Sequence, residues 1–293
     1  PMDTQQTYKV GLVQMAMSPE VSDNLEKAVR MSEKAASQGA DVICLPELFI
    51  TPYFPREEDP EGKRERGSFL STIPGLVTET LSDLARRTGA VIIGGSIYEA
   101  AEDGLFNTAT VFEGDGVMLG KYRKTHIPHD ECFYEQDYFT PGDTGFQVFP
   151  TSRGKVSVLI CYDQWFPEAA RCSALLGAEI IFYPTAIGTV RGIGQAEGDW
   201  QQAWENVMRG HAIANAVPVC AVNRVGFEGE SEFYGGSFVC DAFGKTLARA
   251  GSGEEVLLAE IDMDHSERVR EGWRFFHNRR PECYGALVQK GGK

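Results

Sequence analysis

Residues 10–45 read VGLVQMAMSPEVSDNLEKAVRMSEKAASQGADVICL, and this stretch indicates the fold class of the whole chain. Short β-branched runs at residues 10–14 and 41–45 flank an amphipathic stretch at residues 24–38. A strand, a helix and a second strand in this order predict an α/β fold.

The same alternation continues to the C-terminal part of the chain. Asp23 is predicted to cap the first helix, and Gly39 and Gly89 to end the first and second helices in a left-handed conformation. Pro167 suits the first position of a third helix, because its φ is fixed near the helical value. Helices are thus predicted at residues 24–38 and 77–88, after Pro167, and at 199–215. Strands are predicted at residues 90–94, 108–112, 117–119, 155–161, 179–183, 217–222, 236–240 and 256–261.

Two segments of the chain resemble each other. Residues 39–47 (GADVICLPE) and 177–185 (GAEIIFYPT) share a helix end, an acidic residue, an apolar strand and a proline. This pattern is compatible with two similar half-domains, and equally with an ordinary exit from a helix into a parallel strand. Because no low-complexity linker interrupts the chain, we expect residues 1–293 to form a single domain.

Two further segments, residues 51–68 and 187–198, are rich in Pro, Gly and charge. They are predicted to be long loops, and long ordered loops in a compact α/β domain often carry function.

Composition narrows the class of protein. The chain has 293 residues, of which 42% are hydrophobic, enough for a substantial core, so disorder and a small disulfide scaffold are excluded. Its net charge of -14 argues against nucleic acid or an anionic membrane surface as a partner, because phosphates are bound chiefly by Lys and Arg.

Cysteine usage and the ends of the chain indicate a compartment. Seven Cys without a C-x-x-C pair or zinc-site spacing indicate reduced thiols in a cytoplasmic protein. The N-terminal residues lack the features of an export signal, and no uncharged apolar run approaches the ~20 residues of a membrane span.

Three side chains at predicted strand ends could carry chemistry. Cys161 stands where a strand turns into a helix, a place that favours a reactive thiolate, although a single Cys in an apolar strand usually packs as a small hydrophobe. Glu47 lies in an apolar run, where burial would suit a general base; alternatively, it turns to solvent. Lys124 is either an oxyanion stabiliser or part of a solvated basic edge. All three can converge, because sites form beyond the carboxyl ends of strands.

At this point the sequence resembles the nitrilase superfamily of carbon–nitrogen hydrolases. The motifs are LPELF at residues 45–49, YRKTH at 122–126 and ICYDQWFPE at 160–168, and the resemblance extends from Val10 to Pro281. It implies a four-layer αββα sandwich, with helical layers outside two mixed sheets, that assembles into a homo-oligomer. The C-terminal segment, residues 265–293, is expected to take part in subunit packing. No cofactor and no metal ion are implied.

The resemblance also assigns roles to residues. It makes Cys161 the nucleophile, Glu47 the general base, and Lys124 the oxyanion stabiliser, assisted by the backbone N–H of Tyr162. A second glutamate of the family falls on Glu135, in YEQDYFTPG at residues 134–142. The alternative for Glu135 is a surface loop position.

The residues after the nucleophile favour one branch of the family. Relatives that cleave N-carbamoyl amino acids have arginines where this chain has Gln164 and Trp165, because a guanidinium fork suits a carboxylate. The segment 161–171 and YPTAIG at residues 183–188 resemble the branch that acts on N-carbamoylputrescine, a small cationic ureido substrate. Trp165, Thr185 and Ala186 are accordingly expected to contact substrate.

The ammonium group of such a substrate needs its own partners. Glu197 and Asp199 could supply charge, and Tyr53 could supply a cation–π contact, although solvated loop charges are the alternative for the two carboxylates. The tail RRPECYGAL at residues 279–287 carries a Tyr-Gly-Leu-like ending that is also seen in relatives that act on carbamoyl amino acids, so these substrates and ω-amides stay open. A catalytically inactive assembly module is the non-enzymatic alternative. Asn223 and Arg224 either line the pocket or brace it.

Overall fold

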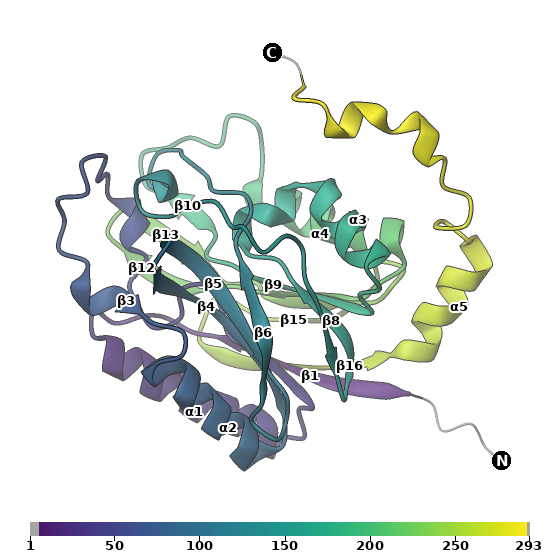
Figure 1. The fold of residues 1–293 in the computed structure, drawn as a ribbon, viewed down its shortest axis with the longest axis horizontal. Helices are drawn as coiled ribbons and strands as arrows, with labels where there is room; N and C mark the ends of the chain where they lie inside the picture. The colour runs from purple at the N-terminus through teal and green to yellow at the C-terminus, as the bar shows by residue number, and fades with distance from the viewer. Residues whose placement is uncertain (1–5, 292–293) are drawn as a thin grey trace.

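The computed structural model describes residues 6–291, and these form two β-sheets stacked between two pairs of helices (Figure 1). Helices α1 (Val21–Ser37) and α2 (Leu76–Thr88) cover one sheet, and α3 (Pro167–Leu175) and α4 (Trp200–Asn215) cover the other. This arrangement confirms the predicted αββα sandwich. Two short stretches lie outside the described range. They are residues 1–5, which belong to the N-terminal stretch expected to lack an export signal, and residues 292–293, the last two of the segment 265–293.

The first sheet is mixed and has the strand order β16-β1-β2-β4-β5-β6, with β3 paired to β4. β1, β2 and β4 run parallel to one another and β3 runs parallel to β4, whereas the pairs β16–β1, β4–β5 and β5–β6 are antiparallel. Its strands are β1 (Thr7–Gln14), β2 (Val42–Cys44), β3 (Leu70–Ser71), β4 (Val91–Ala101), β5 (Gly104–Phe112), β6 (Met118–Arg123) and β16 (Glu255–Asp262).

The second sheet has the order β15-β14-β11-β9-β8-β7, with a parallel centre of β8, β9 and β11. Its strands are β7 (Val148–Thr151), β8 (Gly154–Val158), β9 (Ile180–Pro184), β11 (Val219–Val222), β14 (Phe238–Cys240) and β15 (Thr246–Arg249). A small third sheet contains β10 (Gly188–Val190), β12 (Val225–Glu228) and β13 (Ser231–Tyr234).

The two similar sequence segments contribute one central strand to each main sheet. The first supplies β2 and the second supplies β9, and each is entered through a left-handed glycine, Gly39 with φ +89° and Gly177 with φ +101°. Each strand has parallel neighbours on both sides.

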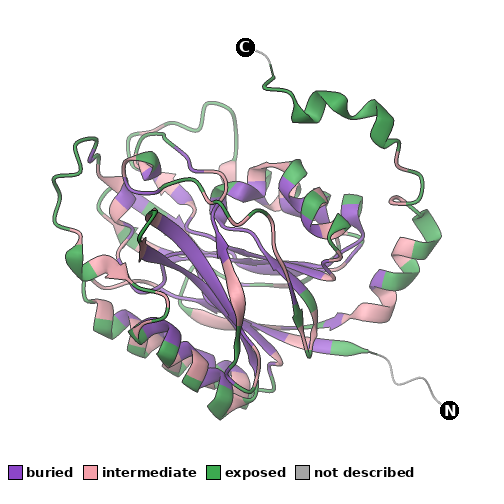
Figure 2. Ribbon diagram, in the orientation of Figure 1, coloured by how far each residue is buried: buried purple, intermediate pink, exposed green. Residues whose placement is uncertain are grey.

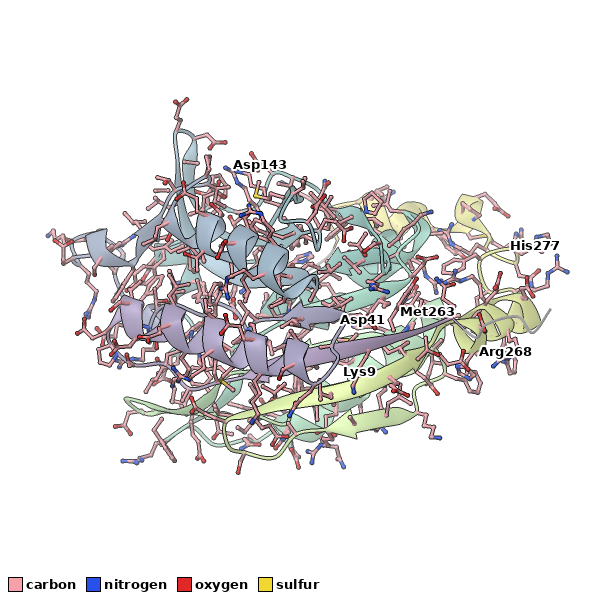
Figure 3. All side chains as sticks on the ribbon, turned by 90° about the horizontal axis from the view of Figure 1, so that it is seen from below. Lys9, Asp41, Asp143, Met263, Arg268 and His277 are labelled. Atoms are coloured by element: carbon pink, nitrogen blue, oxygen red, sulfur yellow. The ribbon has the colours of Figure 1, made fainter. Side chains whose placement is uncertain are left out.

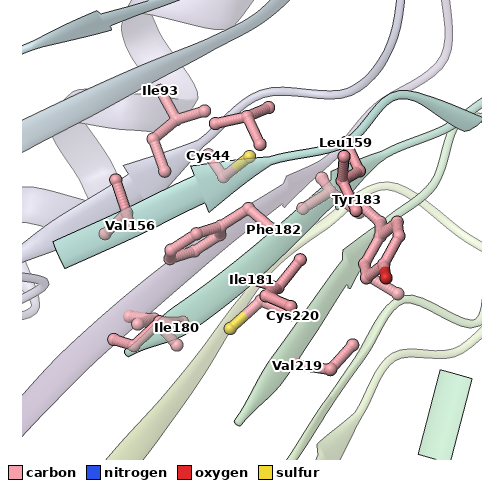
Figure 4. Close-up of a cluster of buried hydrophobic side chains, with 14 of the residues drawn as sticks. Cys44, Ile93, Val156, Leu159, Ile180, Ile181, Phe182, Tyr183, Val219 and Cys220 are labelled. Carbon is pink, nitrogen blue, oxygen red and sulfur yellow. The ribbon is translucent and has the colours of Figure 1, made fainter. Parts of the chain in front are cut away.

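Alternation along the strands builds two cores. In β2, Val42 and Cys44 belong to the core shared by the two sheets, whereas Ile43 belongs to the core under α1 and α2, as the two-residue period of a strand requires. Figure 4 shows Cys44 beside Phe182 of the opposite sheet. Both sheets are therefore buried along most of their length (Figure 2).

Several predicted boundaries were wrong. Helix α1 starts at Val21 after Glu20, so Asp23 lies in the first turn and does not cap it. The chain before α1 is held by Asn24, whose side chain accepts from Ser18 N and donates to Ser18 O. Residues 188–190, expected in a loop, form β10 because they pair with β13, and neither β12 nor β13 was predicted.

Beyond the sandwich, α5 (Met263–Trp273) and the following residues extend along one end of the molecule. Figure 3 labels Arg268 on α5 and His277 after it at this end. Within residues 6–291, no helix is long and apolar enough to cross a membrane.

Candidate active site

Cys161 occupies a strained turn at the end of a central strand. β8 stops at Val158, earlier than the predicted residue 161, and Cys161 starts a 3-10 turn, Cys161–Trp165. Its φ is +44°, a conformation that costs a non-glycine residue roughly 1–3 kcal/mol and is concentrated at functional sites. The side chain is buried, with Sγ 3.8 Å from the main-chain oxygen of Ala186.

Asp163 ties this turn to the segment that carries Lys124. One carboxylate oxygen accepts from Ile160 N at 2.9 Å and from the Tyr122 hydroxyl at 2.6 Å. The other accepts from His126 N at 3.0 Å and lies 2.7 Å from His126 Nδ1. His126 therefore contacts Asp163, which holds the two segments together.

Lys124 follows β6 and is buried between two carboxylates. Its Nζ donates to Glu47 Oε1 at 2.9 Å and to Glu135 Oε2 at 2.6 Å. Burial lowers the pKa of Lys124, but the charges of Glu135 and Glu47 outweigh burial and raise that pKa above its ordinary value. The ammonium is therefore held charged inside the protein, and Lys124 is not part of a solvated edge.

Glu47 is fully buried two residues after Leu45, at the carboxyl end of β2. Its Oε1 accepts hydrogen bonds from Lys124 and, at 2.8 Å, from Asn107 Nδ2. Its Oε2 is buried without a hydrogen-bond partner. Glu47 thus turns inward and keeps one oxygen free to accept a proton.

Glu135 lies in the 3-10 turn Glu135–Asp137 and is also fully buried. Besides Lys124, it binds the Tyr53 hydroxyl, which donates to Oε1 at 2.7 Å. Burial raises the pKa of Glu135 to about 7; Lys124 opposes this rise and Glu47 adds to it. Tyr53 is inaccessible from the surface and orients this carboxylate.

The electrostatics favour the neutral thiol in the resting protein. Burial raises the pKa of Cys161 well above its ordinary value, and the charge of Glu47 raises it further, whereas Lys124 lowers it. A hydrogen bond with Thr185 also lowers it. Attack by sulfur therefore requires an acceptor for the thiol proton, and the free Oε2 of Glu47 is an acceptor of the required kind.

Some residues of the turn Cys161–Trp165 face the site, and others pack in the core. Tyr162 is the second residue of the 3-10 turn, where a backbone N–H has no acceptor within the turn. Gln164 is buried and engaged: its Oε1 accepts from Trp204 Nε1 at 2.7 Å and its Nε2 donates to Thr185 Oγ1 at 3.4 Å. Trp165 is half-buried against the core shared by the sheets.

In the described structure, neither Glu197 nor Asp199 forms a hydrogen bond with Glu47, Lys124 or Cys161. Both are exposed before α4, where Glu197 accepts from Trp200 Nε1 at 2.5 Å and Asp199 caps the helix by accepting from Gln202 N at 2.9 Å.

Arg224 braces the loop after Glu47, which is one of the two roles that the sequence allows for it. It is fully buried, and Nη2 donates to the main-chain oxygens of Glu47 and Leu48, at 3.2 and 2.9 Å. Nη1 donates to Thr51 O at 3.1 Å and to Glu228 Oε2 at 2.9 Å. A lone arginine at the end of an apolar strand is a sequence signal for such a role, because a buried guanidinium needs partners.

Sequence reasoning missed Asn107 and Glu228. Asn107 binds Glu47, and Glu228 accepts from Tyr53 N at 2.8 Å in addition to Arg224. The signal for Asn107 was an amide inside an apolar strand with no turn beside it. Within residues 6–291, no group of three or more His, Cys, Asp or Glu side chains is arranged to hold a metal ion.

Comparison with known proteins agrees with this geometry. Residues 9–271 match the carbon-nitrogen hydrolase family. N-carbamoylputrescine amidase of Solanum tuberosum is 42% identical, with 97% of this chain and 95% of the relative covered. Citrullinase of Francisella tularensis is 37% identical, with 96% and 98% covered. The crystal structure of a carbon-nitrogen hydrolase from Helicobacter pylori superposes with a TM-score of 0.89 at 40% identity, with 97% of this chain and 99% of that chain covered. The chain therefore belongs to the carbon-nitrogen hydrolase family, within the nitrilase superfamily, and is an amidohydrolase that acts on carbon–nitrogen bonds.

Proposed function

We propose that this enzyme hydrolyses N-carbamoylputrescine to putrescine, ammonia and carbon dioxide through a thioester on Cys161. The observation that carries the proposal is the buried Lys124 ammonium between Glu47 and Glu135, next to the strained Cys161 turn. The substrate class is supported by the 42% identity with the potato N-carbamoylputrescine amidase.

The first half of the reaction forms the thioester. Glu47 Oε2 takes the thiol proton as Sγ of Cys161 bonds to the ureido carbonyl carbon. The resulting oxyanion is stabilised by the Lys124 ammonium and the Tyr162 backbone N–H. Glu47 returns the proton to the terminal nitrogen, the carbon–nitrogen bond breaks, and ammonia leaves a carbamoyl thioester.

The second half of the reaction hydrolyses the thioester and regenerates the free thiol of Cys161. Glu47 takes a proton from a water molecule, whose oxygen bonds to the thioester carbonyl carbon. The carbon–sulfur bond breaks, the proton passes to the sulfur of Cys161, and an N-alkyl carbamic acid is released. That acid decomposes to putrescine and carbon dioxide without further help from the protein.

The distal ammonium is proposed to lie toward Tyr234. Tyr234 and the exposed Glu232 line a cavity of about 440 Å³, and within residues 6–291 the buried Tyr234 hydroxyl has no hydrogen-bond partner. Burial raises the pKa of Tyr234, and charges on Cys161, Glu205 and Asp199 raise it further. Gln201 lines the same cavity two residues after Asp199, so Asp199 rather than Glu197 is proposed as the carboxylate that binds the ammonium.

Asp199→Asn separates charge from helix capping, because Asn caps as well as Asp. We expect this variant to raise KM for N-carbamoylputrescine about 10-fold, the effect of losing roughly 1.4 kcal/mol of binding, with KM for a neutral amide unchanged. Equal changes for both substrates would contradict this placement of the ammonium.

Citrulline is the second candidate substrate, favoured by the 37% identity with a citrullinase. Citrulline has the same ureido group but also carries a carboxylate. At the positions where carboxylate-binding relatives have arginines, Gln164 is fixed in the core and Trp165 packs on it, so neither offers a cationic fork. The geometry therefore favours the carbamoyl diamine.

The deciding experiment measures ammonia and amine release from N-carbamoylputrescine, citrulline, N-carbamoyl-D-amino acids, N-carbamoyl-β-alanine and simple ω-amides, with Cys161→Ala as control. Preference for the carbamoyl diamine, lost in the variant, supports the proposal. Preference for a carboxylate-bearing substrate would still be consistent with Cys161 as the nucleophile, but it would overturn the proposed substrate class.

We also propose that the C-terminal segment packs against a second copy of the chain. Trp273, Tyr284, Leu287 and Val288 expose apolar side chains there, and water-exposed apolar groups of this size are stabilised by burial in an interface. Sedimentation of the chain truncated after residue 274 tests this: the full chain should be an oligomer and the truncated chain a smaller species. An unchanged oligomer would contradict the proposal.

A further inference from the structure

Asn107 contacts two of the catalytic groups at once. It lies on β5 and is 1% exposed. Its side-chain Nδ2 donates to Glu47 Oε1 at 2.8 Å, and its main-chain oxygen accepts from Lys124 N at 2.8 Å. One residue of a central strand therefore fixes both the carboxylate and the backbone of the lysine that binds it.

The side-chain amide of Asn107 does not stabilise the core. Within residues 6–291 its Oδ1 is buried without a hydrogen-bond partner, and an unpaired buried carbonyl destabilises the folded protein. An apolar side chain at this position would not have that cost. In the part of the chain that the structure describes, the one side-chain hydrogen bond of Asn107 goes to Glu47. The stability lost through the unpaired Oδ1 is therefore associated with holding the Glu47 carboxylate.

The two donors to Glu47 act on the same oxygen. Lys124 Nζ and Asn107 Nδ2 both bind Oε1, Asn107 from β5 and Lys124 from the residue that follows β6. Two donors from different directions fix the plane of the carboxylate, which a single flexible lysine cannot do. Oε2, the oxygen without a partner, is then held in a fixed position.

We propose that Asn107 is a positioning residue for Glu47: it orients the carboxylate so that Oε2 takes the thiol proton. This inference rests on the role of Glu47 in the proposed function. The other titratable or charged groups that face Glu47 are Lys124, Glu135, Cys161 and Tyr53, while Arg224 binds its main-chain oxygen.

The test compares Asn107→Asp and Asn107→Ala with wild type. Asp has the size of Asn but cannot donate when ionised and adds a negative charge; Ala removes the donor alone. We expect kcat to fall about 100-fold in both, the effect of misplacing a catalytic group, with KM changed less than about 3-fold. The profile of kcat/KM against pH should also shift, further for Asp than for Ala, because only Asp adds a negative charge beside the catalytic groups.

Thr110→Val is the matched control, since Thr110 is a buried polar residue on the same strand with no contact to the catalytic groups in the described structure. It should leave kcat and the pH profile unchanged. Kinetic profiles of folded Asn107→Asp and Asn107→Ala that superimpose on wild type, or a loss confined to KM, would overturn the inference. Circular dichroism checks that each variant is folded, and Asn107→Ser replaces any variant that is not.

A second measurement separates this inference from the substrate assignment. Alkylation of Cys161 by iodoacetamide needs no substrate, and its rate depends on transfer of the thiol proton. We expect the pH at which alkylation reaches half its maximal rate to move upward in both Asn107 variants. If wild type fails to hydrolyse N-carbamoylputrescine but this shift is present, the substrate assignment fails and the positioning role stands. An unchanged alkylation profile would overturn the positioning role whatever the substrate.

Discussion

Arg224 donates a 2.9 Å hydrogen bond to the main-chain oxygen of Leu48, the residue that follows Glu47 and has a φ of +48°. A left-handed leucine persists only where surrounding contacts hold it. The buried guanidinium supplies such contacts on one side, and the Ser96 hydroxyl, which accepts from Leu48 N at 2.8 Å, supplies them on the other. The direction of the Glu47 side chain therefore depends on residues distant in the sequence.

Arg224→Lys should reduce activity more than it reduces stability. Lysine keeps the positive charge beside Glu228 but cannot reach the oxygens of Glu47, Leu48 and Thr51 together, as the guanidinium fork does. We expect kcat to fall about 10- to 100-fold with the fold intact, since a shift of 1 Å at a catalytic group can cost 10²-fold. Steady-state kinetics and urea unfolding check this, and wild-type kcat in the variant would show that the brace is dispensable.

Cys161→Ala should abolish turnover without unfolding the protein. Alanine has the same Cβ as cysteine and tolerates the +44° φ equally well, so the turn has no reason to change. Ammonia release and circular dichroism are the measurements. Turnover at the wild-type rate would show that the sulfur of Cys161 is not the nucleophile.

Lys124→Ala should reduce both activity and stability. Loss of an oxyanion-stabilising group costs roughly 3 kcal/mol in the transition state, or 10²–10³ in kcat. Glu47 and Glu135 are also left buried without their counter-charge, which should cost about 3–5 kcal/mol of unfolding free energy.

The double variant Lys124→Met/Glu135→Gln separates these two effects. Removing one carboxylate together with the lysine should recover part of the unfolding free energy and none of the activity. Full activity in either variant would refute the oxyanion role of Lys124.

Glu135→Gln should change the pH dependence of stability. Burial raises the pKa of Glu135 from 4.5 to about 7, so the folded protein binds that proton more tightly than the unfolded chain. Its contribution is fully present below pH 4.5 and is lost as pH rises through 7. The unfolding free energy of wild type relative to Glu135→Gln should therefore fall by roughly 3 kcal/mol between pH 4.5 and 8, at 1.36 kcal/mol per pKa unit. Urea unfolding at both pH values measures the difference, and a pH-independent difference would contradict it.

Local sequence patterns predicted the α/β class and the candidate residues at strand ends, whereas the four layers were implied by the resemblance to the nitrilase superfamily. The period of apolar residues and the glycine signals placed α2 and the central strands of both sheets to within a few residues. Glu47 and Lys124 follow β2 and β6 of the first sheet, whose parallel strands end at a common edge. Cys161 follows β8 of the second sheet, so its approach to the other two residues depends on how the two sheets stack. The small sheet of β10, β12 and β13 escaped prediction because its short strands are stabilised by pairing and carry no clear alternation of their own.

What the sequence alone determined was therefore which side chains reach the site and which family the chain resembles. What only the tertiary structure decided was how those side chains are held. Asn107 binds Glu47 across 60 residues, and Arg224 binds Leu48 across 176. The burial that raises the pKa of Glu135 likewise arises only when the chain is folded. Hydrogen bonds and desolvation of this kind depend on distances in space, and no spacing along the chain specifies them.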